Sequence, residues 1–567
     1  MLNVSFPDHL HFIQIAMTLI YPRYLSLVIL FAFSFFLYLP VNAQRTSGGE
    51  VNVSRLVLVI NVEQMRTDYL RRYQRKFQQD GFMRLVRDGA VCTNAEINLH
   101  VQKSLTGVPT LFTGVYPDRH GIINSSWFDR LREKETDALE DDYCITVGSD
   151  SKEGQRSAAL LLSPTVGDEL KLKTNGKAKV FSVGLNDYSA VFSAGHAADG
   201  AYWLDNQSGN MISSSYYVSQ FPGWAVDFNN KKFADLYVSR DWTTLLPQTS
   251  YDESLKDDYL LEKGYYDKWN TFPYHISKLK SRAGSYKVLK TTPFGNTMVT
   301  DFSLALIRAE QLGTDDVPDL LTVSYSSMDY ENGSFGPSSV EMEDIYLRLD
   351  QEIARLLSYL DKNIGMNKTL VILTSACSAS YPVDYLKEEF NMPVGHVAPE
   401  SMVALLKSYL NITYGQGDWV EFIGDQQIYL NRGLIEKKKL KMEDVQALAA
   451  TFINQFEGIK LALPASDFEK GDYVKSQLTL ISKSFSFKRS GDILYTLENG
   501  WQPQYKYKRT IYTDNPHIPM IWMGSRVKSM RNLTRVDATD MVPTIFEILG
   551  FDVPSFCEGR ILEEILW

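Results

Sequence analysis

Residues Gln102–Gly121 read QKSLTGVPTLFTGVYPDRHG and lie at the centre of the predicted fold. An apolar run before them, Arg55–Asn61 (RLVLVIN), is typical of a fully buried strand. Within the central stretch, the pattern predicts a helix over Ser104–Thr113. At such a helix start, unpaired backbone N–H groups and the positive end of the helix dipole favour an anion. The same position also suits a serine that only caps the helix.

The rest of the chain alternates strand-like and helix-like patterns. Buried strands are predicted at residues 179–185, 320–326, 369–374 and 518–523, and helices at residues 67–89, 165–173, 340–360 and 540–549. This alternation predicts a three-layer α/β fold, with a mostly parallel central sheet and helices on both faces. Two stretches interrupt the pattern, at residues 201–290 and 381–500, and we interpret both as inserted cap regions.

The N-terminus has the pattern of a signal peptide. Arg23 precedes the apolar run Tyr24–Leu39, which leads to the small-residue site Val41-Asn42-Ala43. We therefore expect residues 1–43 to be removed after Ala43, which leaves a mature chain of residues 44–567. The alternative is an uncleaved anchor, because the apolar run is nearly long enough to span a bilayer. No later run is long enough, so we predict an exported protein, periplasmic or associated with the cell envelope, without a membrane span after cleavage.

Charge and cysteine content exclude some functions. The net charge of −10 argues against nucleic acid as a partner, because nucleic-acid binding needs a basic face. The four cysteines, Cys92, Cys144, Cys377 and Cys557, are too widely spaced for a zinc knuckle. Since an exported protein can form disulfides, we expect one or two structural bridges among them.

Ligands of open parallel sheets bind beyond the carboxyl ends of the strands. Applied to this chain, the rule brings several polar or chemically reactive positions into one neighbourhood. These are Glu63, Ser104, Asn186, Asp329, Ala376, Cys377 and Lys508.

Several segments together resemble one known family. They include VEQMRTDYL, TGVYPDRHGI, GDELKLKTNGKAKVFSVGL, VSYSSMDYENGSFGP, NPHIPMIWMG and DATDMVPTIFEILG, in this order along the chain. The chain is similar to the alkaline phosphatase superfamily, and most of all to its exported, phosphate-irrepressible monoesterase branch. The resemblance implies a single α/β domain with inserted caps, a Thr or Ser nucleophile, and two zinc ions that stabilise the attacking and leaving oxygens.

The resemblance assigns the first zinc ion and the nucleophile to particular positions. The nucleophile corresponds to Ser104. An Asp ligand of the first zinc ion corresponds to Glu63, which is still a carboxylate but longer by one methylene group. The Asp-His pair that completes this site corresponds to Ala376 and Cys377.

By the same resemblance, only one ligand of the second zinc ion is retained in this chain, the carboxylate of Asp329. Gly333 stands at one histidine position and Lys508 at the other.

The family's phosphate-binding positions have also changed. The Lys and Arg that hold phosphate correspond to Asn186 and Tyr188. The phosphate-binding Asn corresponds to Ser125, and Asn124 is displaced from it by one position.

Zinc needs about four nitrogen, oxygen or sulfur ligands, and too few remain. We therefore expect no cofactor. Lys508 would instead neutralise Asp329 or Glu63, carboxylates that otherwise lack a counter-charge. These changes predict a pseudophosphatase that acts by binding or assembly, with a small anionic ligand or an envelope partner.

Two alternatives remain open at this point. The first is a phosphoric-ester hydrolase that uses Ser104 with an altered or absent metal, with Lys103 and Lys508 as anion-binding groups. No histidine is placed as its base, because His196 and His517 lie in family-typical segments where we expect packing roles. For Cys377, the alternatives are a lone zinc or redox ligand and a small buried apolar residue.

The second alternative is a glycan- or envelope-binding module that uses aromatic residues of the first insertion. The competing interpretation is that these rings pack the cap onto the core. The residues concerned are Trp203, Tyr216, Tyr217, Trp224, Trp242, Tyr265 and Tyr266.

Overall fold

The computed structural model describes residues 54–266, 268–326, 335–469, 477–505 and 515–567. The predicted signal peptide, Asp329, Gly333 and Lys508 lie outside these ranges. In the described part of the chain, no helix is both long enough and apolar enough to cross a bilayer.

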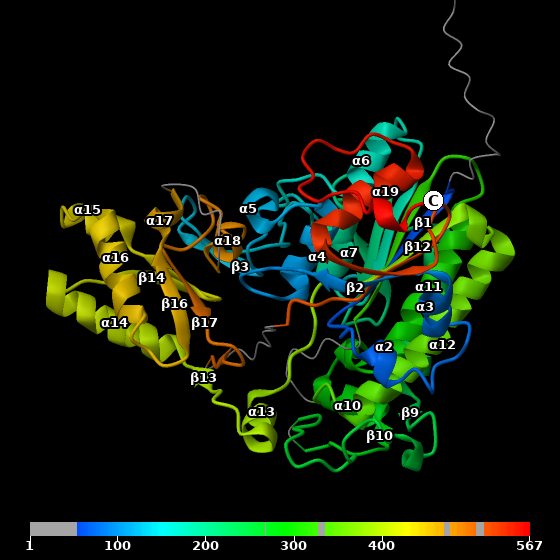
Figure 1. The fold of residues 1–567 in the computed structure, drawn as a ribbon, viewed down its shortest axis with the longest axis horizontal. Helices are drawn as coiled ribbons and strands as arrows, with labels where there is room; N and C mark the ends of the chain where they lie inside the picture. Colours follow the sequence, from blue (N-terminus) through cyan, green and yellow to red (C-terminus); the bar gives the residue numbers. More distant parts are fainter. Residues whose placement is uncertain (1–53, 267, 327–334, 470–476, 506–514) are drawn as a thin grey trace, which may run out of the picture. The chain divides into compact units, whose positions relative to one another are not determined.

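The largest element is a ten-stranded sheet with the order β20-β2-β19-β12-β1-β11-β6-β7-β8-β5. Figure 1 labels β1, β2 and β12 of this sheet. The strands are β1 (Leu56–Val62), β2 (Ala90–Glu96), β5 (Thr146–Val147), β6 (Val180–Gly184), β7 (Gly200–Leu204), β8 (Met211–Ser214), β11 (Asp319–Tyr325), β12 (Thr369–Thr374), β19 (Met520–Gly524) and β20 (Met530–Asp537). The five neighbours from β12 to β7 are parallel, whereas β19 and β8 run antiparallel to the strands beside them. The carboxyl ends of β12, β1, β11 and β6 therefore lie along one edge.

Strand β1 shows why the sheet is covered on both faces. All seven of its residues are buried. Leu58 and Ile60 belong to one apolar cluster, whereas Val57 and Val59 belong to another. Because successive side chains of a strand point to opposite faces, these two clusters are the cores on the two sides of the sheet.

Helices supply the rest of both cores. On one side are α2 (Tyr69–Arg72), α3 (Phe82–Asp88), α11 (Pro293–Glu310) and α12 (Val340–Asn363). On the other side are α4 (Ser104–Thr113), α6 (Val166–Lys173), α7 (Asp187–Ala194) and α19 (Met541–Leu549). The three-layer α/β prediction is confirmed.

The prediction of one helix over residues 67–89 is wrong, because α2 and α3 are separate. Asp350 on α12 accounts for the break. Its carboxylate accepts the backbone N–H groups of Gln78 at 2.6 Å and Phe82 at 2.7 Å. Gly81 lies so close that a Cβ there would meet Asp350 Oδ1 at 2.1 Å. In a continuous helix, the N–H groups of Gln78 and Phe82 would donate to carbonyls of the helix itself. Here they donate to the buried carboxylate of Asp350 instead.

The stretch 201–290 divides into two parts. Strands β7 and β8 extend the main sheet. The remainder forms α8 (Gly223–Asn230), α9 (Phe233–Val238), β9 (Asp241–Trp242), β10 (Tyr274–His275) and α10 (Ile276–Ala283). Trp203, Trp242 and Tyr265 are buried, and Tyr216, Tyr217 and Trp224 pack against the cores, while Tyr266 is partly exposed. Packing, rather than a stacking surface for glycans, is therefore the role of most of these rings.

The stretch 381–500 has an apolar cluster of its own. Its four-stranded antiparallel sheet has the order β14 (Val420–Gly424), β15 (Gln427–Leu430), β17 (Ile493–Leu497) and β16 (Ile459–Pro464). Helices α14 (Pro399–Tyr414) and α16 (Met442–Ile453) pack on this sheet. A further helix, α13 (Val383–Phe390), follows the loop after β12.

The expected disulfide bridges are absent, because all four cysteines are free. Each has different neighbours. Cys92 on β2 faces Asn532, and Cys377 faces Ser104. Cys557 lies near Gly114. Disulfide formation requires close and correctly oriented Cβ atoms, which these separate environments do not provide.

Two carboxyl groups are buried where the first insertion packs on α12. Glu341 is fully buried and accepts a hydrogen bond from the Tyr274 hydroxyl, and Glu262 is nearly as buried. Burial, with smaller effects from neighbouring carboxylates, raises the pKa of Glu341 to about 8 and the pKa of Glu262 to about 9.

This burial predicts a pH-dependent stability. The unfolded chain releases both protons near pH 4.5, whereas the folded chain keeps them. Stability from this source is therefore fully present below about pH 4.5 and is lost as pH rises through about 8 to 9. We expect Glu341→Gln to flatten this decline, which urea unfolding at several pH values measures. The exposed Glu436→Gln is the control, and an unchanged slope in Glu341→Gln would contradict the assignment.

Candidate functional site

Glu63 follows β1 directly and is fully buried. Three hydroxyl groups donate hydrogen bonds to its carboxylate. Tyr188 donates to Oε2, whereas Ser189 and Ser326 donate to Oε1, the latter at 2.7 Å. A buried carboxylate is costly unless it is hydrogen-bonded, and here both oxygens have donors.

The parallel sheet brings these donors together. Tyr188 and Ser189 lie in the first turn of α7, which begins just after β6 ends. Ser326 follows β11 directly. Asn186, at the N-cap of α7, donates its amide to the Tyr188 hydroxyl at 3.2 Å. The strand order β1-β11-β6 thus produces a polar cluster around Glu63, which we call the Glu63 cluster (Glu63, Asn186, Tyr188, Ser189 and Ser326).

Ser104 is the first residue of α4, and its side chain is 5% exposed. The N-cap position is occupied by Lys103, so Ser104 does not cap the helix. Its Oγ lies 3.3 Å from the Sγ of Cys377, which follows β12. The predicted nucleophile position and a predicted metal-ligand position are therefore neighbours, joined by a hydroxyl–thiol contact.

Gly107 fixes the distance between α4 and the end of β12. A Cβ on Gly107 would meet the backbone oxygen of Ala376 at 1.8 Å. Only a glycine allows this approach, which brings Ser104 and Cys377 into contact.

The loop after β12 is also tied to the end of β1. The backbone N–H of Met65 donates to Ser375 Oγ at 3.1 Å, and the N–H of Ala379 donates to the carbonyl of Gln64 at 3.1 Å. The Ser104–Cys377 pair and the Glu63 cluster are thus held at the same edge of the sheet, as the strand-end rule predicts.

Lys103 forms an ion pair with Asp425, in the turn between β14 and β15. Both side chains are largely buried, at 12% and 4% exposure. The lysine charge beside Ser104 is therefore compensated by the second insertion, and an anionic ligand would compete with Asp425 for it.

The other predicted positions have local partners. Asn124 is buried and accepts a hydrogen bond from the backbone of Ser125 at 2.8 Å. His196 lies 3.1 Å from the hydroxyl of Tyr216, which fits a packing role. His517 is exposed, so a packing role for its side chain is wrong, although its backbone pairs with Glu96.

Sequence reasoning missed Ser189, Ser326 and Asp425. Ser326 ends the apolar run at 320–326, and a polar residue at the carboxyl end of a parallel strand was an available signal. Ser189 lies one helical turn after Asn186, a spacing that places both on one face. Asp425 carries no local signal, because its partner lies far away in the chain.

The described residues do not fit a pair of zinc ions. Zinc requires about four donors, and a ligating carboxylate must offer a lone pair to the metal. Glu63 Oε1 accepts two hydroxyl groups and Oε2 accepts one, so little of this carboxylate is left to bind a metal, and Ala376 has no side-chain donor atom. Within the described ranges, no group of three His, Cys, Asp or Glu side chains is arranged to hold a metal.

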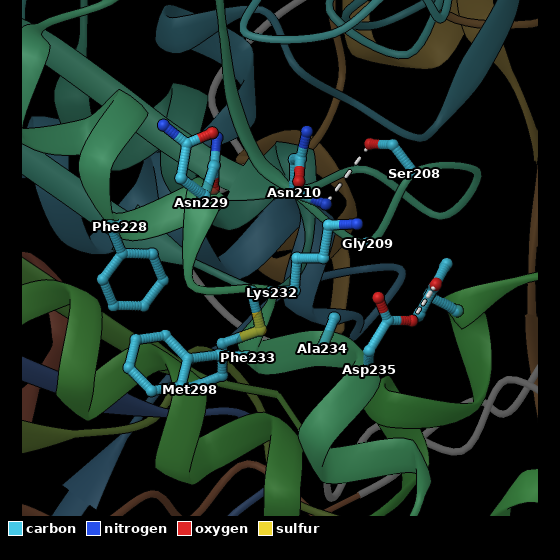
Figure 2. Close-up of a pocket in the computed structure, with 12 residues that line it drawn as sticks. Ser208, Gly209, Asn210, Phe228, Asn229, Lys232, Phe233, Ala234, Asp235 and Met298 are labelled. Atoms are coloured by element: carbon cyan, nitrogen blue, oxygen red, sulfur yellow. Dashed lines mark hydrogen bonds between the residues drawn. The ribbon is translucent and has the colours of Figure 1, made fainter.

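A separate cavity of about 380 Å³ lies in the first insertion. Figure 2 shows Phe228, Phe233 and Met298 together, with Asn210 and Asn229 nearby. Asn229 is engaged with the backbone of Met211 through both ends of its amide. None of the predicted site residues lines this cavity.

Comparisons with known proteins agree with this architecture. Residues 57–520 match the family model "Type I phosphodiesterase / nucleotide pyrophosphatase". The chain is 32% identical to alkaline phosphatase PafA of Elizabethkingia meningoseptica, over 93% of this chain and 96% of that protein. It is 34% identical to a calcium-transporting ATPase of Myroides odoratus, over 90% of this chain and 94% of that protein.

A solved structure of PafA superposes on the chain with a TM-score of 0.85 at 32% identity, covering 92% of this chain and all of PafA. The family match, these relatives and the sheet topology lead to one conclusion. The chain belongs to the type I phosphodiesterase / nucleotide pyrophosphatase family, within the alkaline phosphatase superfamily.

Proposed function

We propose that this protein is an exported family member that has lost zinc-dependent phosphoester hydrolysis and acts by binding. Its ligand would be a small anion or a partner in the cell envelope. The Glu63 cluster carries the proposal, because a metal-ligand position now serves as the acceptor for three hydroxyl groups.

The identity of one donor strengthens this interpretation. By the family resemblance, Tyr188 stands where a phosphate-binding arginine is expected, and Glu63 stands at a metal ligand. In this chain the two side chains bond to each other. A hydrogen bond typically stabilises a fold by about 0.5–1.5 kcal/mol, so a zinc ion that took the place of the Tyr188 hydroxyl would lose a favourable contact.

Hydrolysis through Ser104 without a metal ion would need a base. The Ser104 hydroxyl contacts the Cys377 thiol, where a catalytic serine would need a histidine or carboxylate. The compensated charge of Lys103 also weakens the anion site that this alternative requires.

Metal content and turnover test the proposal together. We expect the purified exported form, beginning at Gln44, to contain substoichiometric zinc by elemental mass spectrometry. Turnover of p-nitrophenyl phosphate should be no greater than that of Ser104→Ala, and EDTA should have no effect, because the ligand set is incomplete.

The hydrolase alternative gives the opposite pattern. Two zinc ions per chain, with EDTA-sensitive turnover that Ser104→Ala abolishes, would end the proposal. A first residue other than Gln44 would contradict cleavage after Ala43, and an intact N-terminal segment would contradict signal cleavage.

A further inference from the structure

A cavity of about 160 Å³ lies where three segments meet. These are the loop before α4 around His100, the loop after β12 around Tyr381, and the second insertion around Gln426 and Trp501. We call it the insertion cavity. Gln102, one of its lining residues, is separated from Ser104 only by Lys103, so the cavity adjoins the candidate site without including it.

Two side chains of its wall contain polar atoms without a partner. His100 is 6% exposed, and neither ring nitrogen has a partner of hydrogen-bond geometry among the described residues, although the backbone of Gln426 lies close enough to affect its pKa. The Oε1 atom of Gln102 is likewise buried and unbonded in the same part of the chain. Each buried polar group without a partner forfeits a hydrogen bond that water would supply. A wall with three such atoms therefore indicates a missing hydrogen-bonding group.

His100 is uncharged at neutral pH. Burial lowers the pKa of its imidazole to about 4, and the backbone of Gln426 offsets only part of this effect. A neutral imidazole offers one N–H donor and one nitrogen acceptor, and Gln102 Oε1 adds an acceptor. A hydroxyl group can donate and accept, so hydroxyls match all three atoms.

The remaining lining distinguishes a neutral ligand from an anion. Its charged side chains are Lys460 and Glu498, one of each sign, so the wall has no excess positive charge to select phosphate. Trp501 adds an apolar ring. The ring packs directly on Gly395 and Gly458. A Cβ atom would lie 2.9 Å from the ring if added to Gly395 and 2.2 Å from it if added to Gly458.

The size limits the ligand further. Sites for drug-sized molecules have volumes of about 300–1,000 Å³, and this cavity is smaller. It suits a single ring-sized group with hydroxyls at its edge and apolar carbons on its faces.

From this lining we propose that the insertion cavity binds one neutral sugar unit, with its hydroxyl groups bonded to His100 and Gln102. The proposal depends only on the cavity, and it holds whether or not Ser104 supports hydrolysis.

The test uses the mature chain and two defined probes, methyl β-D-glucopyranoside and methyl N-acetyl-β-D-glucosaminide. Inorganic phosphate is the charged comparator. Imidazole nitrogen NMR follows the histidines during each titration, and calorimetry measures affinity. We expect at least one glycoside to shift the His100 resonance saturably, and phosphate neither to shift it nor to compete.

Variants then locate the site. His100→Leu and Gln102→Leu should each weaken glycoside binding about tenfold, the loss expected for one hydrogen bond. His275→Leu is the matched control, because His275 is 46% exposed and lies on β10, and its affinity should equal that of the wild type. Gln102→Leu keeps the test valid if His100→Leu fails to fold.

Three results would overturn the proposal. One is the absence of a saturable His100 shift with either glycoside up to tens of millimolar. Another is phosphate binding at the cavity as tight as that of the glycosides. The third is glycoside affinity that Gln102→Leu leaves unchanged in a folded protein.

Discussion

Gly107→Ala is expected to destabilise the protein by about 3 kcal/mol or more. The new Cβ would meet the Ala376 backbone oxygen at 1.8 Å, and neither the helix nor the strand end can yield without moving the sheet edge. Alanine favours a helix over glycine by about 1 kcal/mol, a gain too small to offset this clash. Urea unfolding followed by circular dichroism measures the change.

The chain contains a matched control for this substitution. Gly223 is the first residue of α8, and a Cβ there would meet nothing within 4 Å. We expect Gly223→Ala to leave stability unchanged or slightly increased. Equal effects of the two substitutions would show that α4 is not held against β12 by this contact.

Glu63→Ala is expected to cost about 3–5 kcal/mol, because it leaves the buried hydroxyl groups of Ser189 and Ser326 and the partly buried hydroxyl group of Tyr188 without their acceptor. The loss should be the same with zinc and with EDTA, since the carboxylate acts as a hydrogen-bond acceptor. Thermal and urea unfolding in both conditions measure it. The exposed Glu436→Ala is the control and should have little effect.

A mutant cycle separates this role from a general need for a buried residue. In a background with Tyr188→Phe, Ser189→Ala and Ser326→Ala, the donors are gone, and the added cost of Glu63→Ala should shrink by at least half. If the cost of Glu63→Ala persists in full, or appears only when zinc is present, hydrogen bonding to the three hydroxyl groups is not the reason that Glu63 stabilises the fold.

The sheet could be predicted from local pattern, because β1, β6, β11 and β12 are apolar runs that stay buried in any parallel sheet. The strand-end rule then placed Glu63, Asn186 and Cys377 near Ser104. The predictions of a single helix at 67–89 and of disulfide bridges were wrong, because contacts between distant parts of the chain determine both features. Asp350 broke the helix predicted at 67–89, and the cysteines were separated by elements whose positions no spacing reveals. The hydroxyl partners of Glu63 depend on the order of strands, which a local pattern does not encode.

The ion pair between Lys103 and Asp425 has a consequence for protein engineering. Chimeras that exchange residues 381–500 with those of a relative, or that shorten this stretch, would leave the buried ammonium group of Lys103 without the carboxylate of Asp425. A workable graft must therefore transfer the β14–β15 turn together with position 103, as one unit of design.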